Sequence, residues 1–114
     1  FLAGKLGQAV ASPLVSVVDD ALLPAGLASR PFDAEGTPSR RTPILEKGTL
    51  KSYLCDSYSA RKLKLASTGN ASRPPGESVS VSPTNFWMEA GADTPEAIVA
   101  GVKNGFYVCV SVSE

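Results

Sequence analysis

The residues with the most chemical potential lie between positions 55 and 76, in the segment CDSYSARKLKLASTGNASRPPG. Hydroxyls, cations and glycines together can hold a phosphate, activate a nucleophile or bind an extended chain. A phosphate loop needs the pattern GxxxxGK[ST], which STGNASRPPG lacks. A serine nucleophile would have only a lysine as its base, and Lys62 and Lys64 are predicted to be solvated. These residues therefore favour a polar surface loop over a self-contained catalytic set.

The chain has no histidine, which excludes Ser-His-Asp and Cys-His catalysis and most zinc and iron sites. Cys55 and Cys109 form no CxxC pair, and both are predicted to be buried reduced thiols. The carboxylate pairs Asp19-Asp20 and Asp33/Glu35 are predicted to have structural roles, with Asp33 in a turn. We therefore expect neither catalytic residues nor a metal site in this chain.

With 114 residues, of which 43% are hydrophobic, the chain is predicted to form a single domain, 1–114, with one core. Its net charge is zero, yet residues 40–73 contain eight Lys/Arg against two acidic residues. A solvated face is the favoured interpretation of this basic segment, and a phosphate-bearing or acidic partner is the alternative. No apolar run reaches the roughly 18 residues of a membrane span, and no signal peptide is predicted.

Both ends of the chain resemble cut ends. The sequence begins without Met and stops at Glu114, directly after a strand-like run. We therefore expect a fragment of a longer protein.

The first half of the chain predicts a strand and then a hairpin. Residues 14–18 form the strand, which Asp19-Asp20 would stop, and residues 21–41 are predicted to be a long irregular connection. Two β-prone runs, 42–46 and 49–55, flank a Lys47-Gly48 turn. This turn places Leu45 opposite Leu50 as a cross-strand apolar pair.

A short helix is expected next. Asp56 or Ser57 can cap it, and it would continue through Lys64 with Ala60 and Leu63 on one side. Residues 66–78 are predicted to be irregular.

The second half predicts two strands, 78–82 and 84–89, with Phe86 and Met88 sharing one face. Asp93 and Glu96 then form a D-x-x-E cap for a helix that ends at Asn104-Gly105. The predicted buried stripe of this helix is Ile98, Val99 and Val102. Residues 106–113 alternate as a final strand, and the residues predicted to face the core are Phe106, Val108, Val110 and Val112. Hairpins with two short helices define an α+β fold with a mostly antiparallel sheet.

Five segments in this order resemble the C-terminal half of the TldD/PmbA family, metallopeptidase-related proteins also described as modulators of DNA gyrase. The segments are ASPLVSVVDD, FDAEGTP, ILEKGTLKSYLCDSYSARKL, STGNAS and TNFWMEAG with TPEAIVAGVKNGFYV. Together they extend to about Val108, and YSARKL with STGNA is similar to the PmbA-like branch. The tail YVCVSVSE departs from the glycine-rich continuation of the family.

The resemblance implies a cytoplasmic peptidase complex that matures or degrades extended peptides. In such a complex a TldD-type subunit carries zinc on HExxxH and a distant cysteine, and a PmbA-type partner lacks the metal motif. No histidine ligand can be transferred to this chain, and neither Cys55 nor Cys109 lies where the family's cysteine ligand is expected. The implied role is therefore a non-catalytic structural and peptide-binding portion, inactive alone, with a homologous partner subunit in a hetero- or homo-oligomer.

An extended peptide would be held by main-chain hydrogen bonds to a strand edge and to polar loops. The residues predicted to contact it are Arg61, Ser67, Thr68, Gly69, Asn70 and Arg73. The competing interpretation of the same loop is a structural connection packed against the rest of a larger protein. An interaction domain that binds nucleic acid or an acidic protein through residues 40–73 is the alternative function. Nucleic acid is the less favoured partner because no known binding module is present.

Overall fold

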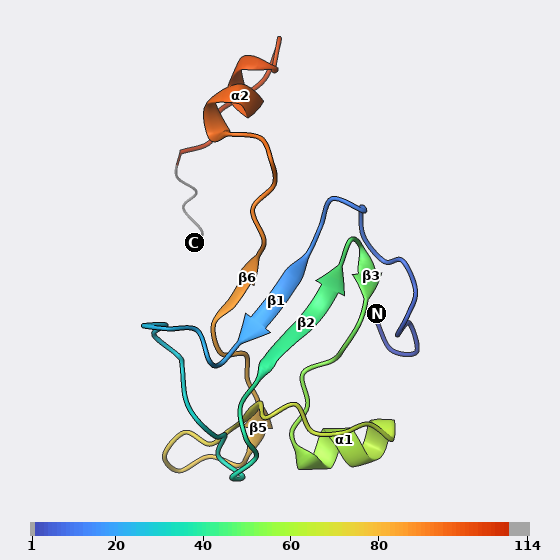
Figure 1. Ribbon diagram of the computed structural model, residues 1–114, viewed down its shortest axis with the longest axis vertical. Coiled ribbons are helices and arrows are strands. Elements are labelled where there is room, and N and C mark those ends of the chain that lie inside the picture. The colour runs from blue at the N-terminus through green and yellow to red at the C-terminus, as the bar shows by residue number, and fades with distance from the viewer. Residues whose placement is uncertain (1, 110–114) are drawn as a thin grey trace.

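The computed structural model describes residues 2–109 and has an α+β fold built around a four-stranded antiparallel sheet (Figure 1). The strand order is β3-β2-β1-β6, with bounds Thr49–Leu50, Arg41–Glu46, Val17–Asp20 and Phe86–Met88. A second sheet pairs β4, Ala71–Ser72, with β5, Ser80–Val81. The two helices are α1, Ser57–Leu63, and α2, Pro95–Ala100. The predicted fold class is confirmed.

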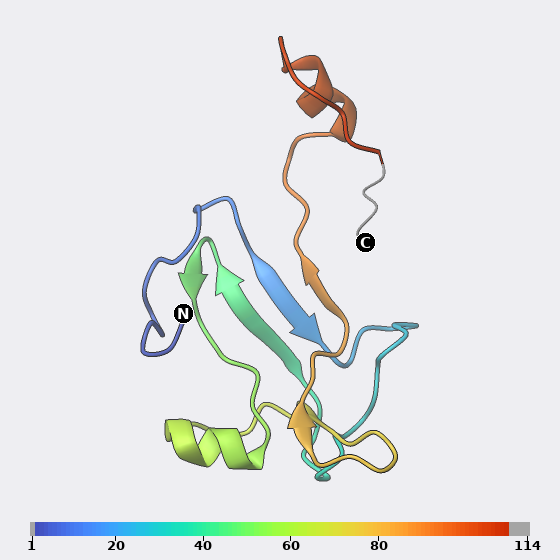
Figure 2. The ribbon, with the colours of Figure 1, turned by 180° about the vertical axis from the view of Figure 1, so that it is seen from behind.

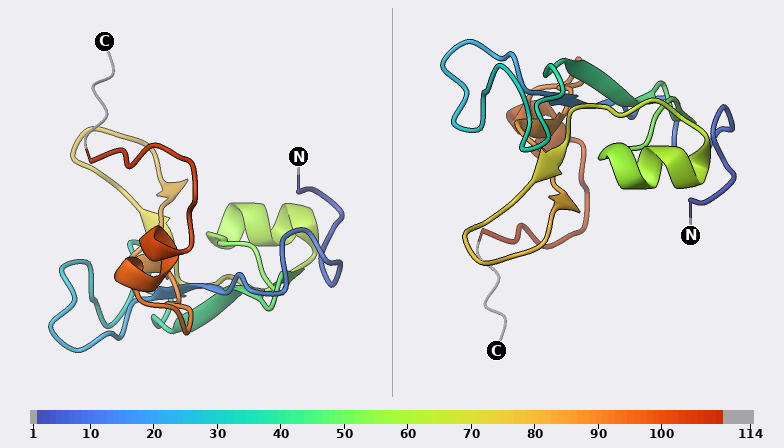
Figure 3. Two further views of the ribbon diagram at one scale, coloured as in Figure 1. Left: turned by 90° about the horizontal axis from the view of Figure 1, so that it is seen from above. Right: turned by 90° about the horizontal axis from the view of Figure 1, so that it is seen from below.

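The layers are arranged asymmetrically. Viewed along the sheet, α1 and the β4–β5 pair lie on the same side of the four-stranded sheet (Figure 3). Viewed from behind, α2 lies beyond the end of β6, away from the sheet (Figure 2). The radius of gyration is 17.3 Å, whereas a compact domain of this length has about 13 Å. The difference reflects the projecting C-terminal segment.

The hairpin prediction is confirmed at its turn. Leu45 pairs with Leu50, and Lys47 and Gly48 have φ values of 47° and 78°. Two successive positive φ values are typical of the tight turn that matches strand twist. The second strand is shorter than predicted, because β3 ends at Leu50.

The first strand was misplaced by the sequence pattern. Asp19 and Asp20 do not stop a strand but form the second half of β1. Asp19 pairs with Thr42 on β2 and with Phe86 on β6. A carboxylate can occupy a buried strand position when its oxygens are hydrogen-bonded, and those of Asp19 are, as described below.

The C-terminal predictions are wrong in several respects. Thr94, not Asp93, caps α2, and the helix ends at Ala100 with a right-handed cap at Gly101. The predicted apolar stripe is exposed, as are Phe106, Tyr107 and Val108, and residues 106–109 form no strand. Val110 to Ser113 lie outside the described residues. Within residues 2–109 no other helix or strand packs extensively against α2, so its amphipathic pattern has no core to face.

Candidate peptide-binding site

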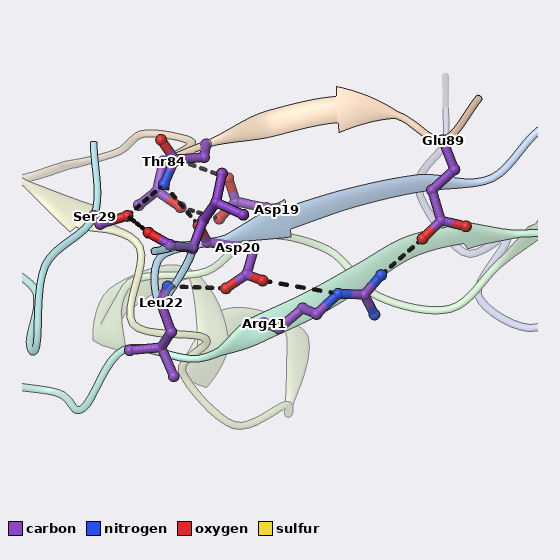
Figure 4. A network of polar contacts seen from close by, with 9 residues as sticks. Asp19, Asp20, Leu22, Ser29, Arg41, Thr84 and Glu89 are labelled. Atoms are coloured by element: carbon purple, nitrogen blue, oxygen red, sulfur yellow. Dashed lines mark hydrogen bonds and ion pairs between the residues drawn. The ribbon is translucent and has the colours of Figure 1, made fainter. Parts of the chain in front are cut away.

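The predicted binding loop is held by a buried polar network that begins at Asp19, which is 1% exposed. Asn70 Nδ2 donates to Asp19 Oδ2 over 2.7 Å, and the Thr84 amide donates to Asp19 Oδ1 over 2.6 Å. The Thr84 hydroxyl lies 3.0 Å from Oδ2, and Figure 4 shows this approach of Thr84 to Asp19. Three separate segments therefore meet at one carboxylate.

Thr68 extends the network toward α1. Its Oγ1 lies 2.6 Å from Asn70 Oδ1 and accepts from the Cys55 amide over 2.7 Å. The neighbouring Ser67 hydroxyl donates to the Cys55 carbonyl over 3.2 Å. Thr68 and Asn70 are buried, and their polar atoms are hydrogen-bonded within the chain. This arrangement gives both residues a structural role; their contact with a peptide stays a prediction.

Gly69 has a φ of 76° and is buried between Thr68 and Asn70. A Cβ at this position would lie 2.8 Å from the carbonyl oxygen of Pro38. The segment that approaches this glycine closely is therefore part of the same chain. The positive φ and the close Pro38 carbonyl together strongly favour glycine at this position.

Arg61 and Arg73 are the exposed members of the predicted site. Among the residues that the structure describes, the Nε atoms donate to nearby carbonyls, that of Ser57 for Arg61 and that of Glu77 for Arg73. Both guanidinium groups are thus positioned at the surface, where a ligand could reach them.

The basic segment 40–73 does not form one charged face. Arg40 donates to the Ser67 carbonyl, and Lys51 forms an ion pair with Glu46 over 3.2 Å. Arg41, on β2, forms ion pairs with Asp20 of β1 at 3.8 Å and with Glu89, directly after β6, at 2.7 Å, and Figure 4 shows it between the two carboxylates. Among residues 2–109, no ion pair involves the α1 cations Arg61, Lys62 and Lys64.

The start of α1 is heavily hydrogen-bonded. Asp56 accepts the Ser59 amide in a capping box, and the Glu35 carboxylate accepts the amide and hydroxyl of Ser57 over 2.8 and 2.6 Å. Hydrogen bonds from the Ser59 side chain and backbone hold the pKa of Asp56 below its ordinary value. Burial raises the pKa of the adjacent Cys55 thiol, which is free and fully buried. Cys55 is therefore a buried free thiol, as predicted, whereas the same prediction is wrong for Cys109, which is exposed.

The family resemblance implies zinc on a TldD-type partner subunit rather than on this chain, and the residues described here do not form a zinc site. A zinc site needs three or four Cys, His or carboxylate ligands around one point. Across positions 2–109, no group of three such residues is arranged in that way. Within the same positions, no helix has the length and hydropathy of a membrane span.

The feature that sequence reasoning missed is the outer edge of β6. The Asp20 amide donates to the Asn85 carbonyl, and the Glu89 amide donates to the Ser16 carbonyl. In an antiparallel pair, residues that are hydrogen-bonded to the neighbouring strand alternate with residues whose backbone groups point the other way. Because Asn85 and Glu89 are bonded to β1, the backbone groups of Phe86 and Met88 point away from β1. Both side chains are exposed, at 51% and 63%. The sequence pattern predicted that Phe86 and Met88 share one face. Nothing in that pattern indicated that their strand lies at an open edge of the sheet.

The opposite edge of the sheet is protected. The Gly7 amide donates to the Leu50 carbonyl, the Leu50 amide donates to the Gln8 carbonyl, and Ala9 forms a β-bridge with Thr49. Residues 7–9 thus occupy the outer side of β3. In the described part of the chain, β6 provides the one open edge of the four-stranded sheet, and an open edge can pair with another strand.

Comparison with known proteins places this geometry in a family. Residues 1–112 match the model of the PmbA/TldA metallopeptidase C-terminal domain. A relative in Haemophilus influenzae, named metalloprotease TldD homolog, is 36% identical over 108 residues, which is 91% of this chain and 22% of the relative. The metalloprotease PmbA of Escherichia coli O157:H7 is 44% identical over 71 residues, covering 62% of this chain and 16% of that protein.

Solved structures agree with the sequence matches. The crystal structure of TldE from Thermococcus kodakarensis superposes with a TM-score of 0.79 and 30% identity, covering 89% of this chain and 23% of TldE. The chain belongs to the TldD/PmbA family and corresponds to its C-terminal domain, as the sequence resemblance predicted. It spans less than a quarter of the length of these relatives.

Proposed function

We propose that this chain is the non-catalytic, peptide-holding portion of a TldD/PmbA-type assembly. The observation that carries the proposal is the open outer edge of β6, where the exposed residues Phe86 and Met88 direct their backbone groups away from β1. An edge of this kind binds an extended chain through main-chain hydrogen bonds, which are insensitive to most side chains. Peptide cleavage takes place in another part of the assembly.

The buried network supports the same role. Asp19 accepts hydrogen bonds from Asn70 and from Thr84, which lies two residues before β6. The bonds from Thr84 fix the start of β6 relative to β1, and the bond from Asn70 holds the same carboxylate in place. A rigid edge loses little conformational entropy when a peptide pairs with it, and so binds more tightly than a loose one.

The test compares one polypeptide in two states. We expect the chain to bind reduced, carboxymethylated ribonuclease, which is extended, and not native ribonuclease. We also expect it to hydrolyse neither. The double variant Phe86→Thr/Met88→Thr should lose the binding, whereas Leu14→Thr, at a side chain that is 91% exposed elsewhere, should keep it. Hydrolysis by the chain alone, or equal binding of native ribonuclease, would contradict the proposal.

A second candidate function rests on the exposed cations of α1. Lys62 Nζ lies 5.5 Å from the centre of the Tyr58 ring, and Arg61 lines the same shallow surface hollow. Such a surface suits an acidic partner. Its signature is binding that weakens steeply with salt, which main-chain pairing at β6 does not share. Replacing Arg61 and Lys62 by alanine separates the two functions.

A further inference from the structure

We infer that the β6 edge accepts an antiparallel peptide in which two residues, separated by one, are both apolar and neither is proline. This inference rests on the proposed function and names the peptide class that the edge accepts. It follows from three properties of β6: the direction of its free backbone groups, the side chains beside them and the geometry of the sheet.

The backbone sets the first requirement. Phe86 and Met88 each present an amide and a carbonyl on the outer edge, since Trp87, between them, pairs with Val18 on β1. A peptide residue opposite Phe86 and another opposite Met88 each exchange two hydrogen bonds with β6. The peptide residue between them directs its backbone away. Two alternate peptide residues must therefore have amide hydrogens, and the middle one need not.

The side chains set the second requirement. Residues directly opposite each other on antiparallel strands lie on the same face of the sheet. The two hydrogen-bonded peptide residues therefore place their side chains beside Phe86 and Met88, which are exposed and apolar. Valine or isoleucine at both positions would bury apolar surface against the ring and the thioether. A charged residue there would lose solvation without gaining a partner, because Glu89 beyond the strand is paired with Arg41.

The sheet sets the direction. Each pairing in the four-stranded sheet is antiparallel, and antiparallel pairing is slightly more stable per residue than parallel pairing. The edge is only three residues long, so the complex is weak and selectivity arises from register rather than from affinity.

The experiment uses the full chain and a capped heptapeptide, acetyl-Lys-Thr-Val-Thr-Ile-Thr-Lys-amide, titrated by NMR. We expect chemical-shift changes and slowed amide exchange at Phe86 and Met88. N-methylation of the valine should weaken binding about two- to tenfold, the value of one hydrogen bond, and methylation of the central threonine should have a smaller effect. The isomer with valine and isoleucine adjacent should bind more weakly than the parent. Phe86→Thr/Met88→Thr should abolish the selectivity, and Leu14→Thr should preserve it.

The outcomes separate the two proposals. If peptides bind at β6 but both methylated forms and the isomer bind equally well, the inferred register is wrong and the proposed function stands. If neither the heptapeptide nor unfolded ribonuclease binds, the proposed function fails and the inference falls with it. Sedimentation of the free chain provides a further check. A dimer joined through β6 that millimolar peptide does not dissociate would show that a second copy is the occupant, which overturns the inference.

Discussion

Asn70 Nδ2 lies 2.7 Å from Asp19 Oδ2, although the two residues are 51 positions apart, and each side chain is 1% exposed. This bond connects the loop before β4 to the centre of β1. It anchors in the core the loop for which the sequence left both peptide contact and a structural role open.

Replacing Asn70 by alanine should destabilise the chain, because the buried carboxylate of Asp19 then loses a donor. The expected loss is about 1–3 kcal/mol in the free energy of unfolding. Urea unfolding followed by fluorescence measures it. Asn104→Ala, at an exposed position, is the matched control and should change stability by less than about 0.5 kcal/mol. Equal effects of the two changes would show that the network contributes nothing specific.

Gly69→Ala and Gly76→Ala separate backbone strain from crowding. Both glycines have positive φ, 76° and 80°, so alanine costs roughly 1–2 kcal/mol at each. Only at Gly69 would the new Cβ meet backbone, the Pro38 carbonyl at 2.8 Å, whereas nothing lies within 4 Å at Gly76. Thermal unfolding should therefore show a clearly lower Tm for Gly69→Ala. A Tm no lower than that of Gly76→Ala would place the Pro38 carbonyl farther away.

Asp56 should make the stability depend on pH in the acid range. Its folded-state pKa is lowered, so its contribution is present above the unfolded pKa of about 3.9 and is lost as the pH falls through the folded pKa. Ser59→Ala removes the hydroxyl that lies 2.6 Å from Oδ1, and should raise the pKa of Asp56 and flatten this dependence. NMR titration of the carboxyl carbon measures the pKa. An unchanged value in the variant would assign the shift to the backbone donors alone.

The two thiols should differ in reactivity. Burial raises the pKa of Cys55 and shields it, whereas Cys109 is exposed. In the native chain iodoacetamide should modify Cys109 first. Cys55 can be alkylated only after the structure around it opens, and an opening free energy of only about 1.4 kcal/mol slows its alkylation tenfold. Mass spectrometry of the wild type and of Cys109→Ser follows the two rates. Urea should remove the difference, and rapid alkylation of native Cys109→Ser would contradict the burial of Cys55.

Local signals in the sequence predicted the local structure well. The Lys47-Gly48 turn fixed the register of Leu45 against Leu50, and the cap at Asp56 placed the start of α1. Both depend on neighbours within a few residues, so they can be read without the fold.

Features that depend on distant partners were not predictable in this way. Asp19 was expected to end a strand because the sequence does not show that Asn70 and Thr84 would bind its carboxylate. The apolar pattern of 98–108 indicated burial, but a pattern specifies a face and not the element that packs against it. For the same reason, the shared face of Phe86 and Met88 was predicted, whereas their position on an open edge was not.

The bridge between Ala9 and Thr49 has a consequence for how molecules of this protein can associate. A sheet with two exposed borders can polymerise without limit, because each added copy offers a fresh border to the next. Among residues 2–109, the border of the four-stranded sheet at β3 is filled by residues 7–9, so copies can extend this sheet only by pairing β6 with β6. That contact is self-complementary and closes on itself, which limits growth through the sheet to a pair and protects the protein from forming fibres by this route.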